Sequence, residues 1–111
     1  MALDYLERIR RERPDFRPEA VSLLSARCLA GTSRAQQARA EFESATERFG
    51  TYESRAEYAI WALAIGDTTT AERLDAELNK ISQRWNALTR DLNAAVERRY
   101  RAARGRALQR A

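Results

Sequence analysis

Residues that could carry out chemistry are scarce in this chain of 111 residues. It has no histidine and a single cysteine, Cys28. Cys28 follows Val21 and Leu24 at helical spacing, so we interpret it as a small core residue rather than a reactive thiol. A zinc site needs clustered Cys or His ligands, and the common catalytic triads and acid–base pairs need an imidazole. The sequence therefore predicts a non-enzymatic protein that uses no metal and no cofactor.

The remaining polar clusters have simpler explanations than a ligand site. The segment of residues 67–70, Asp-Thr-Thr-Thr, lacks the glycines with which a phosphate loop curls around its ligand, and we interpret it as a helix cap. Five glutamates could form an acidic rim on two successive helices, although scattered charges usually cover solvated faces. These glutamates are Glu41, Glu43, Glu47, Glu53 and Glu57.

An arginine-rich segment ends the chain. Residues 98–111 contain six arginines and no acidic residue, whereas residues 1–97 contain 14 basic and 16 acidic residues. Such a segment could contact the phosphates of an anionic membrane or of a nucleic acid. Only Tyr100 could stack on a base, and no nucleic-acid-binding motif accompanies it, so nucleic acid is the weaker expectation. The candidate residues for an anionic surface are Arg98, Arg99, Arg101, Arg104 and Arg106.

Composition and periodicity predict an all-α fold. Hydrophobic residues make up 44% of the chain, with only four glycines and two prolines. Apolar residues at +3 and +4 steps predict helices over residues 2–12, 18–31, 35–49 and 52–65.

Hydroxyl and carboxyl side chains at the turns predict where these helices begin. We expect Thr32 or Ser33 to cap the helix that follows it, Thr51 and Asp67 to cap the next two, and Asn86 to cap the helix after Trp85.

The pattern leaves open whether residues 68–104 form one helix or two. The segment has no Gly or Pro, and its apolar residues follow alternating +4 and +3 steps. We favour a break near Trp85, with one helix over residues 69–83 and a capping helix over residues 87–103 that folds Leu88 and Leu92 onto the body. A buried Trp85 predicts a loss of about 3 to 5 kcal/mol for Trp85→Ala. A continuous helix would instead leave both leucines available to a second copy of the chain.

Small residues recur where two helices of a repeat would cross. Ala2, Ala38 and Ala71 open similar amphipathic runs at intervals of 36 and 33 residues, a period typical of helix-turn-helix solenoids. The pattern resembles the tetratricopeptide repeat (TPR) over residues 1–82. It departs from that repeat at Asp75, where an aromatic residue is usual, and at Ser22 and Ser25, where a Trp and a Leu are usual. The further matching positions are Pro14, Ala26, Ser33, Phe42, Gly50, Ala59 and Gly66.

The stretch from Arg13 to Ala59 is also similar to the C-terminal part of a group of uncharacterised bacterial TPR-like proteins. Residues 13–16, 34–42 and 57–59 carry this similarity. The N-terminal end of that group resembles the hydrophobic lead segment of phospholipase D-nuclease proteins. The resemblance implies a cytoplasmic domain whose full-length protein is anchored at the inner membrane by a segment upstream of this chain. It implies no active-site residue.

The TPR resemblance implies one solenoid domain of about six antiparallel helices over residues 1–111. Such hairpins bury their apolar faces only by stacking on neighbours, so the function is expected to lie in a surface. The expected parts are the second helix of a truncated repeat (1–13), two repeats (17–50 and 51–83), a capping helix (86–104) and a basic tail (105–111).

The predicted function is a scaffold-like protein–protein interaction module. It would bind a peptide or helix of a partner protein on a concave face made by the first helices of the hairpins. Arg27, Arg55 and Tyr58 are the expected partner-binding residues. One alternative is self-association as a homodimer through exposed terminal helices. The other is binding of an anionic membrane or nucleic-acid surface through the arginine-rich tail.

Overall fold

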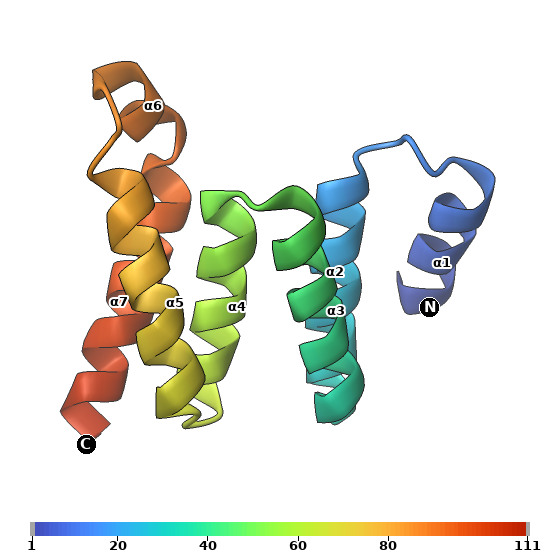
Figure 1. Cartoon of the computed structure of the whole chain (residues 1–111). Helices are drawn as coiled ribbons and strands as arrows, with labels where there is room; N and C mark the ends of the chain where they lie inside the picture. The colour runs from blue at the N-terminus through green and yellow to red at the C-terminus, as the bar shows by residue number, and fades with distance from the viewer. Residues whose placement is uncertain (1, 111) are drawn as a thin grey trace. The chain divides into compact units, whose positions relative to one another are not determined.

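The structure, a computed structural model, describes residues 2–110, and these form seven α-helices without a β-strand (Figure 1). The predicted all-α class is therefore confirmed. The chain divides into two compact units, Met1–Gly50 and Thr51–Ala111, and each contains a helical hairpin with one or more helices packed against it. Within the described residues, no helix is both long enough and apolar enough to cross a membrane.

The first unit consists of α1 (Ala2–Glu12), α2 (Pro18–Gly31) and α3 (Ala35–Phe49). The helices α2 and α3 form an antiparallel hairpin, and α1 packs against α2 (Figure 1). Pro18 begins α2, where the missing N–H of proline costs nothing. Gly50 ends α3 in the left-handed conformation, at φ +63°, and its N–H bonds the carbonyl of Thr46.

The core of the first unit combines small residues with the aromatic ring of Phe42. Ala26 of α2 and Ala38 of α3 are both fully buried, and Phe42 is 1% exposed. Alanine at these positions lets the two helix backbones approach closely. Arg10 also links α1 to α3, because its guanidinium lies 2.7 Å from Glu41 Oε1.

The turn between α2 and α3 differs from the prediction. Neither Thr32 nor Ser33 caps α3, whose N-cap position is Arg34 without a side-chain hydrogen bond. The Thr32 hydroxyl instead donates to the Leu29 carbonyl at 3.1 Å, closing the end of α2. Ser33 takes a left-handed backbone conformation with φ +62°.

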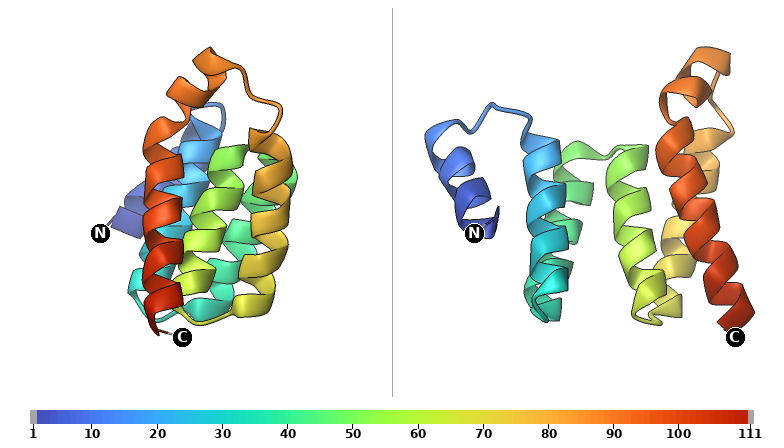
Figure 2. Two further views of the ribbon diagram at one scale, coloured as in Figure 1. Left: turned by 90° about the vertical axis from the view of Figure 1, so that its left-hand side faces the viewer. Right: turned by 180° about the vertical axis from the view of Figure 1, so that it is seen from behind.

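The second unit consists of α4 (Tyr52–Ala64), α5 (Thr68–Ser82), α6 (Ala87–Leu92) and α7 (Ala94–Arg110). The helices α4 and α5 form an antiparallel hairpin, and α7 runs alongside α4 (Figure 2). Because α4 contacts both α5 and α7, most of its circumference is buried, and Ala56, Ala59 and Ala62 have no exposed surface.

Side-chain caps begin three of these helices as the sequence predicts. The Ser54 N–H donates to the Thr51 hydroxyl at 3.1 Å, and the Thr70 N–H donates to the Asp67 carboxylate at 3.2 Å. At α6, the Thr89 N–H donates to the Asn86 side-chain oxygen at 2.8 Å.

The expected break after the α4–α5 hairpin is present, but the capping helix is displaced. The α5 helix ends at Ser82, and the long helix that packs on the hairpin begins at Ala94 rather than at residue 87. It continues to Arg110, so residues 105–110 of the expected basic tail are helical. Leu88 and Leu92 do not fold back, because they lie on the short α6 and are 67% and 77% exposed.

Candidate functional site

The expected partner-binding residues lie in different environments within their own units. Tyr58 is 2% exposed and lies beside Trp61, with 6.1 Å between the ring centroids, so it is buried rather than exposed as expected. Arg55 forms an ion pair with Glu77, its Nε 2.8 Å from Glu77 Oε1. Arg27 is exposed on α2 in the first unit.

The face of α4 that a partner would need is partly occupied by the chain itself. The α7 helix packs along α4, and Arg99 of α7 lies 2.5 Å from Glu57 of α4. The Glu57 side chain is only 7% exposed, so this ion pair belongs to the packed α4–α7 contact. Within the second unit, α7 therefore occupies part of the surface that the sequence analysis assigned to a partner.

Half of the arginines in the C-terminal segment are used within the second unit. Arg99 pairs with Glu57, Arg104 pairs with Asp75, and Arg101 pairs with Glu97 one turn earlier at 3.4 Å. These three ion pairs reduce the charge available to an anionic surface. The other three arginines are exposed and form no side-chain ion pair or hydrogen bond with the described residues. They are Arg98, Arg106 and Arg110.

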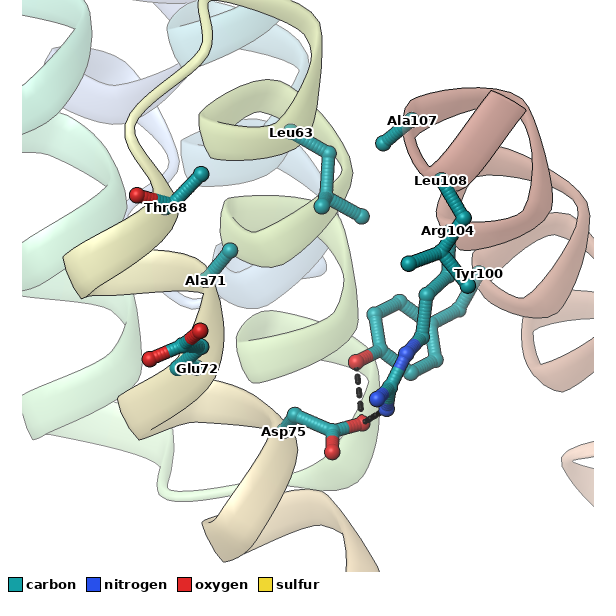
Figure 3. Close-up of a pocket in the computed structure, with 9 residues that line it drawn as sticks. All are labelled: Leu63, Thr68, Ala71, Glu72, Asp75, Tyr100, Arg104, Ala107 and Leu108. Atoms are coloured by element: carbon teal, nitrogen blue, oxygen red, sulfur yellow. Dashed lines mark hydrogen bonds and ion pairs between the residues drawn. The ribbon is translucent and has the colours of Figure 1, made fainter. Parts of the chain in front are cut away.

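A cluster of polar side chains joins α5 to α7. The Tyr100 hydroxyl donates to Asp75 Oδ1 at 2.5 Å, and the Arg104 guanidinium pairs with the same oxygen (Figure 3). The Asn79 side chain donates to the other carboxylate oxygen at 3.3 Å. We call Asp75, Tyr100 and Arg104 the Asp75 cluster. Its three side chains hold α7 across from α5 by polar contacts rather than by close helix packing.

The environment of the Asp75 cluster shifts the pKa of each member. Burial would raise the pKa of Asp75, but hydrogen bonds from Tyr100 and Arg104 outweigh it and hold that pKa below its usual range. Burial, followed by the hydrogen bond to Asp75, raises the pKa of Tyr100. The hydrogen bond to Asp75 raises the pKa of Arg104. The cluster therefore holds a carboxylate, a neutral phenol and a guanidinium at neutral pH.

A cleft of about 280 Å³ opens beside the Asp75 cluster, between the α4–α5 hairpin and the end of α7 (Figure 3). Its walls are mainly apolar, and the cluster closes one end. An apolar side chain of a few carbons fits such a cleft. Besides the cluster, the lining residues are Leu63, Thr68, Ala71, Glu72, Ala107 and Leu108.

Sequence reasoning missed both the Asp75 cluster and the cleft. One available signal was Asp75 itself, a carboxylate next to the buried Leu74 on α5. Another was the apolar series Val96, Tyr100 and Ala103, which continues at +4 and +3 steps through the arginines. Together they indicate a helix that packs beside α5 and meets Asp75.

Other candidate chemistry is sparse in the described part of the chain. Cys28 is partly exposed on α2 rather than fully buried in a core as expected. Across residues 2–110, no group of three or more Cys, Asp or Glu side chains is arranged to hold a metal ion.

Comparisons with known proteins identify no relative. No family model matches the chain, and no curated protein or solved structure matches it.

Proposed function

We propose that the two units are successive repeats of a TPR-like hairpin stack. The support is the equivalent placement of small residues in the two hairpins. Ala26 of α2 and Ala59 of α4 are 33 residues apart, as are Ala38 of α3 and Ala71 of α5. All four are buried, with at most 5% exposure. A repeated crossing geometry explains this spacing better than two unrelated hairpins do.

Within this architecture, we propose that the chain is a non-catalytic protein-interaction module and that the cleft beside the Asp75 cluster is its binding site. The observation that carries the proposal is the open, apolar cleft between helices bridged by side chains. Leu63, Ala71 and Ala107 line it, and Leu108 at its edge is 67% exposed. Apolar clefts with a few placed polar groups are typical binding sites for partner side chains.

Charge around the cleft indicates the chemistry of the partner. The Asp75 carboxylate is compensated by Arg104 and by the Tyr100 hydroxyl, whereas Glu72 has no ion pair among the described residues. One negative charge therefore remains in the lining. We propose that the partner segment inserts an aliphatic side chain and places a neighbouring Lys or Arg against Glu72.

A peptide-display selection tests this proposal. The full chain is used to select from a random peptide library, and selected peptides are then bound to purified variants. Ala107→Glu places a carboxylate in the cleft wall, while Ala102→Glu makes the same change at an exposed position of the same helix. We expect the selected peptides to share an aliphatic residue next to a basic one. Their affinity should fall at least about tenfold for Ala107→Glu, a free-energy cost of about 1.4 kcal/mol.

The selection also defines what would contradict the proposal. Peptides whose binding is equally sensitive to the two alanine substitutions would locate the interaction elsewhere. An absence of selected peptides would remove the interaction-module proposal for this cleft. Circular dichroism of both variants checks that the helices remain folded.

Self-association is a second candidate function, favoured by the exposed leucines of α6. Leu88 and Leu92 lie one turn apart and both project into solvent. A stable interface buries about 800 Å² on each partner, which is more than a six-residue helix supplies alone, so this contact would be weak. Light scattering over a range of concentrations tests it, and a mass that stays monomeric would exclude it. A dimer that persists in Leu88→Ser would exclude α6 as the interface.

A further inference from the structure

We propose that the first unit binds a small phosphate-bearing ligand where the end of α1, the start of α2 and the end of α3 meet. A cavity of about 50 Å³ lies there. This exceeds the roughly 10–15 Å³ that one water molecule needs, so it accommodates a group of several atoms. Three arginines and no acidic residue line it, together with apolar residues and one serine. The lining residues are Arg10, Arg13, Pro14, Phe16, Pro18, Val21, Ser22 and Arg48.

The three arginines differ in how far their charge is already compensated. Arg10 is paired with Glu41 at 2.7 Å, and its second terminal nitrogen lies 3.5 Å from the Ser25 hydroxyl. Arg48 lies over the ring of Phe49, 4.9 Å from its centroid, and has no ion pair with a described residue. The Arg13 side chain has no ion pair or hydrogen bond among the described residues. The cavity therefore has two positive charges available to an anion.

A hydroxyl group also lines the cavity. Ser22 is 6% exposed and contributes to the cavity wall, where its hydroxyl can donate a hydrogen bond to an oxygen of an anion.

The start of α2 favours the same kind of ligand. Arg17 occupies its N-cap position and provides no side-chain cap, because a guanidinium has no acceptor atom. The positive end of the helix dipole lies at this point. Guanidinium forks match the oxygens of a phosphate group, so three arginines, one hydroxyl and a helix start together favour phosphate over a less highly charged anion. The group is either free inorganic phosphate or a phosphate monoester of a small molecule.

Nuclear magnetic resonance titration of the full chain tests this site. Inorganic phosphate and glycerol phosphate are added in separate experiments at constant ionic strength, with chloride as the balancing anion. We expect saturable shifts of the backbone amides of residues 19–22. Tighter binding of glycerol phosphate would assign the site to a monoester, and equal or tighter binding of inorganic phosphate would assign it to the free ion.

Matched substitutions separate a specific site from general positive charge. Arg13→Gln and Arg48→Gln should each weaken binding at least about tenfold, the effect of losing one charge-assisted hydrogen bond. Arg11→Gln is the control, because Arg11 is exposed on α1 and does not line the cavity. Arg48→Lys should recover part of the affinity.

Two results would overturn the proposal. One is a titration of the wild-type protein without saturation or without shifts at residues 19–22, a result that needs no variant to fold. The other is an equal loss of affinity in Arg11→Gln and Arg13→Gln, which would show diffuse attraction to the surface.

Discussion

Asp75 shows how one polar residue can direct the packing of a whole helix. It lies next to the buried Leu74, at a position where the TPR-like repeat that we propose usually has an aromatic residue. Its carboxylate accepts from Tyr100 and Arg104, two residues that lie four positions apart on α7. An aromatic side chain could pack against α7 but could not select these donors. The carboxylate at this position therefore attaches α7 to α5 through polar contacts.

The raised pKa of Tyr100 predicts a loss of stability at alkaline pH. Burial and the hydrogen bond to Asp75 raise this pKa above its ordinary value of 10.0. Above pH 10 the unfolded chain therefore releases a proton that the folded chain retains, and the free energy of unfolding falls as pH rises. We expect the stability advantage of the wild type over Tyr100→Phe to decrease between pH 9 and pH 11.

Urea unfolding at several pH values measures this effect. Tyr5→Phe is the control, because Tyr5 is 61% exposed on α1. If the difference between the wild type and Tyr100→Phe stayed constant with pH, the phenol would not be held neutral by the fold.

At the scale of helices, the sequence predicted the ends that local chemistry determines. Pro18, Gly50, Thr51 and Asp67 mark helix boundaries, and α1 to α5 begin and end within about one residue of the predicted positions. These signals are local, since a cap or a left-handed glycine acts within one turn.

The position of α6 and the course of α7 depend on contacts that local signals do not encode. The arginines of residues 98–110 hid the apolar series that begins at Val96, so that this segment was interpreted partly as a tail. Tyr58 was assigned to the surface because an amphipathic aromatic residue fits either environment. The candidate cleft could not be predicted, since it exists only where α7 lies beside the α4–α5 hairpin.

Replacing either of two exposed glycines, Gly50 and Gly105, by alanine should change the free energy of unfolding in opposite directions. Gly50 has φ +63°, where a Cβ atom is strained, so Gly50→Ala should lower the free energy of unfolding by about 1 kcal/mol. Gly105 lies within α7 with no atom within 4 Å of an added Cβ, so Gly105→Ala should raise it by roughly 0.5–1 kcal/mol. Thermal unfolding followed by circular dichroism compares the two variants. Stabilisation by both substitutions would contradict the helix end at Gly50.

The segment between α5 and α6 changes the expected effect of Trp85→Ala. Trp85 is only partly buried, and its ring centroid lies 4.6 Å from that of Tyr52. The guanidinium carbon of Arg90 also lies over the Trp85 ring, 5.4 Å from its centroid. An aromatic pair contributes about 0.5–1.5 kcal/mol beyond burial. We therefore expect a loss of about 1–2 kcal/mol, below the range for a fully buried Trp. Chemical unfolding measures it, and a loss above about 3 kcal/mol would show that Trp85 is a core residue.

At the scale of the whole molecule, each unit has a hairpin and supporting helices of its own. A unit of this size buries a modest fraction of its surface, so local stability should vary between its helices. In the second unit, α4 is buried on most sides, whereas α6 has no buried residue.

Hydrogen exchange should report this difference along the chain. We expect the amides of α4 to exchange most slowly in the second unit and those of α6 most rapidly, because α6 can open without disturbing a core. Exchange measured by nuclear magnetic resonance or mass spectrometry distinguishes the helices. Protection of α6 equal to that of α7 would indicate that the exposed leucines are covered in solution.

The segment that contains α6 is a site at which additional residues could be inserted into the chain. The segment from residue 83 to residue 93 connects two packed helices, and α6 contributes no residue to the core between them. Doubling the length of a flexible connection costs only about 0.6 kcal/mol of closure entropy. A reporter domain inserted between Leu88 and Thr89 would therefore leave α4, α5 and α7 in place, which makes α6 the natural point at which to build a sensor from this protein.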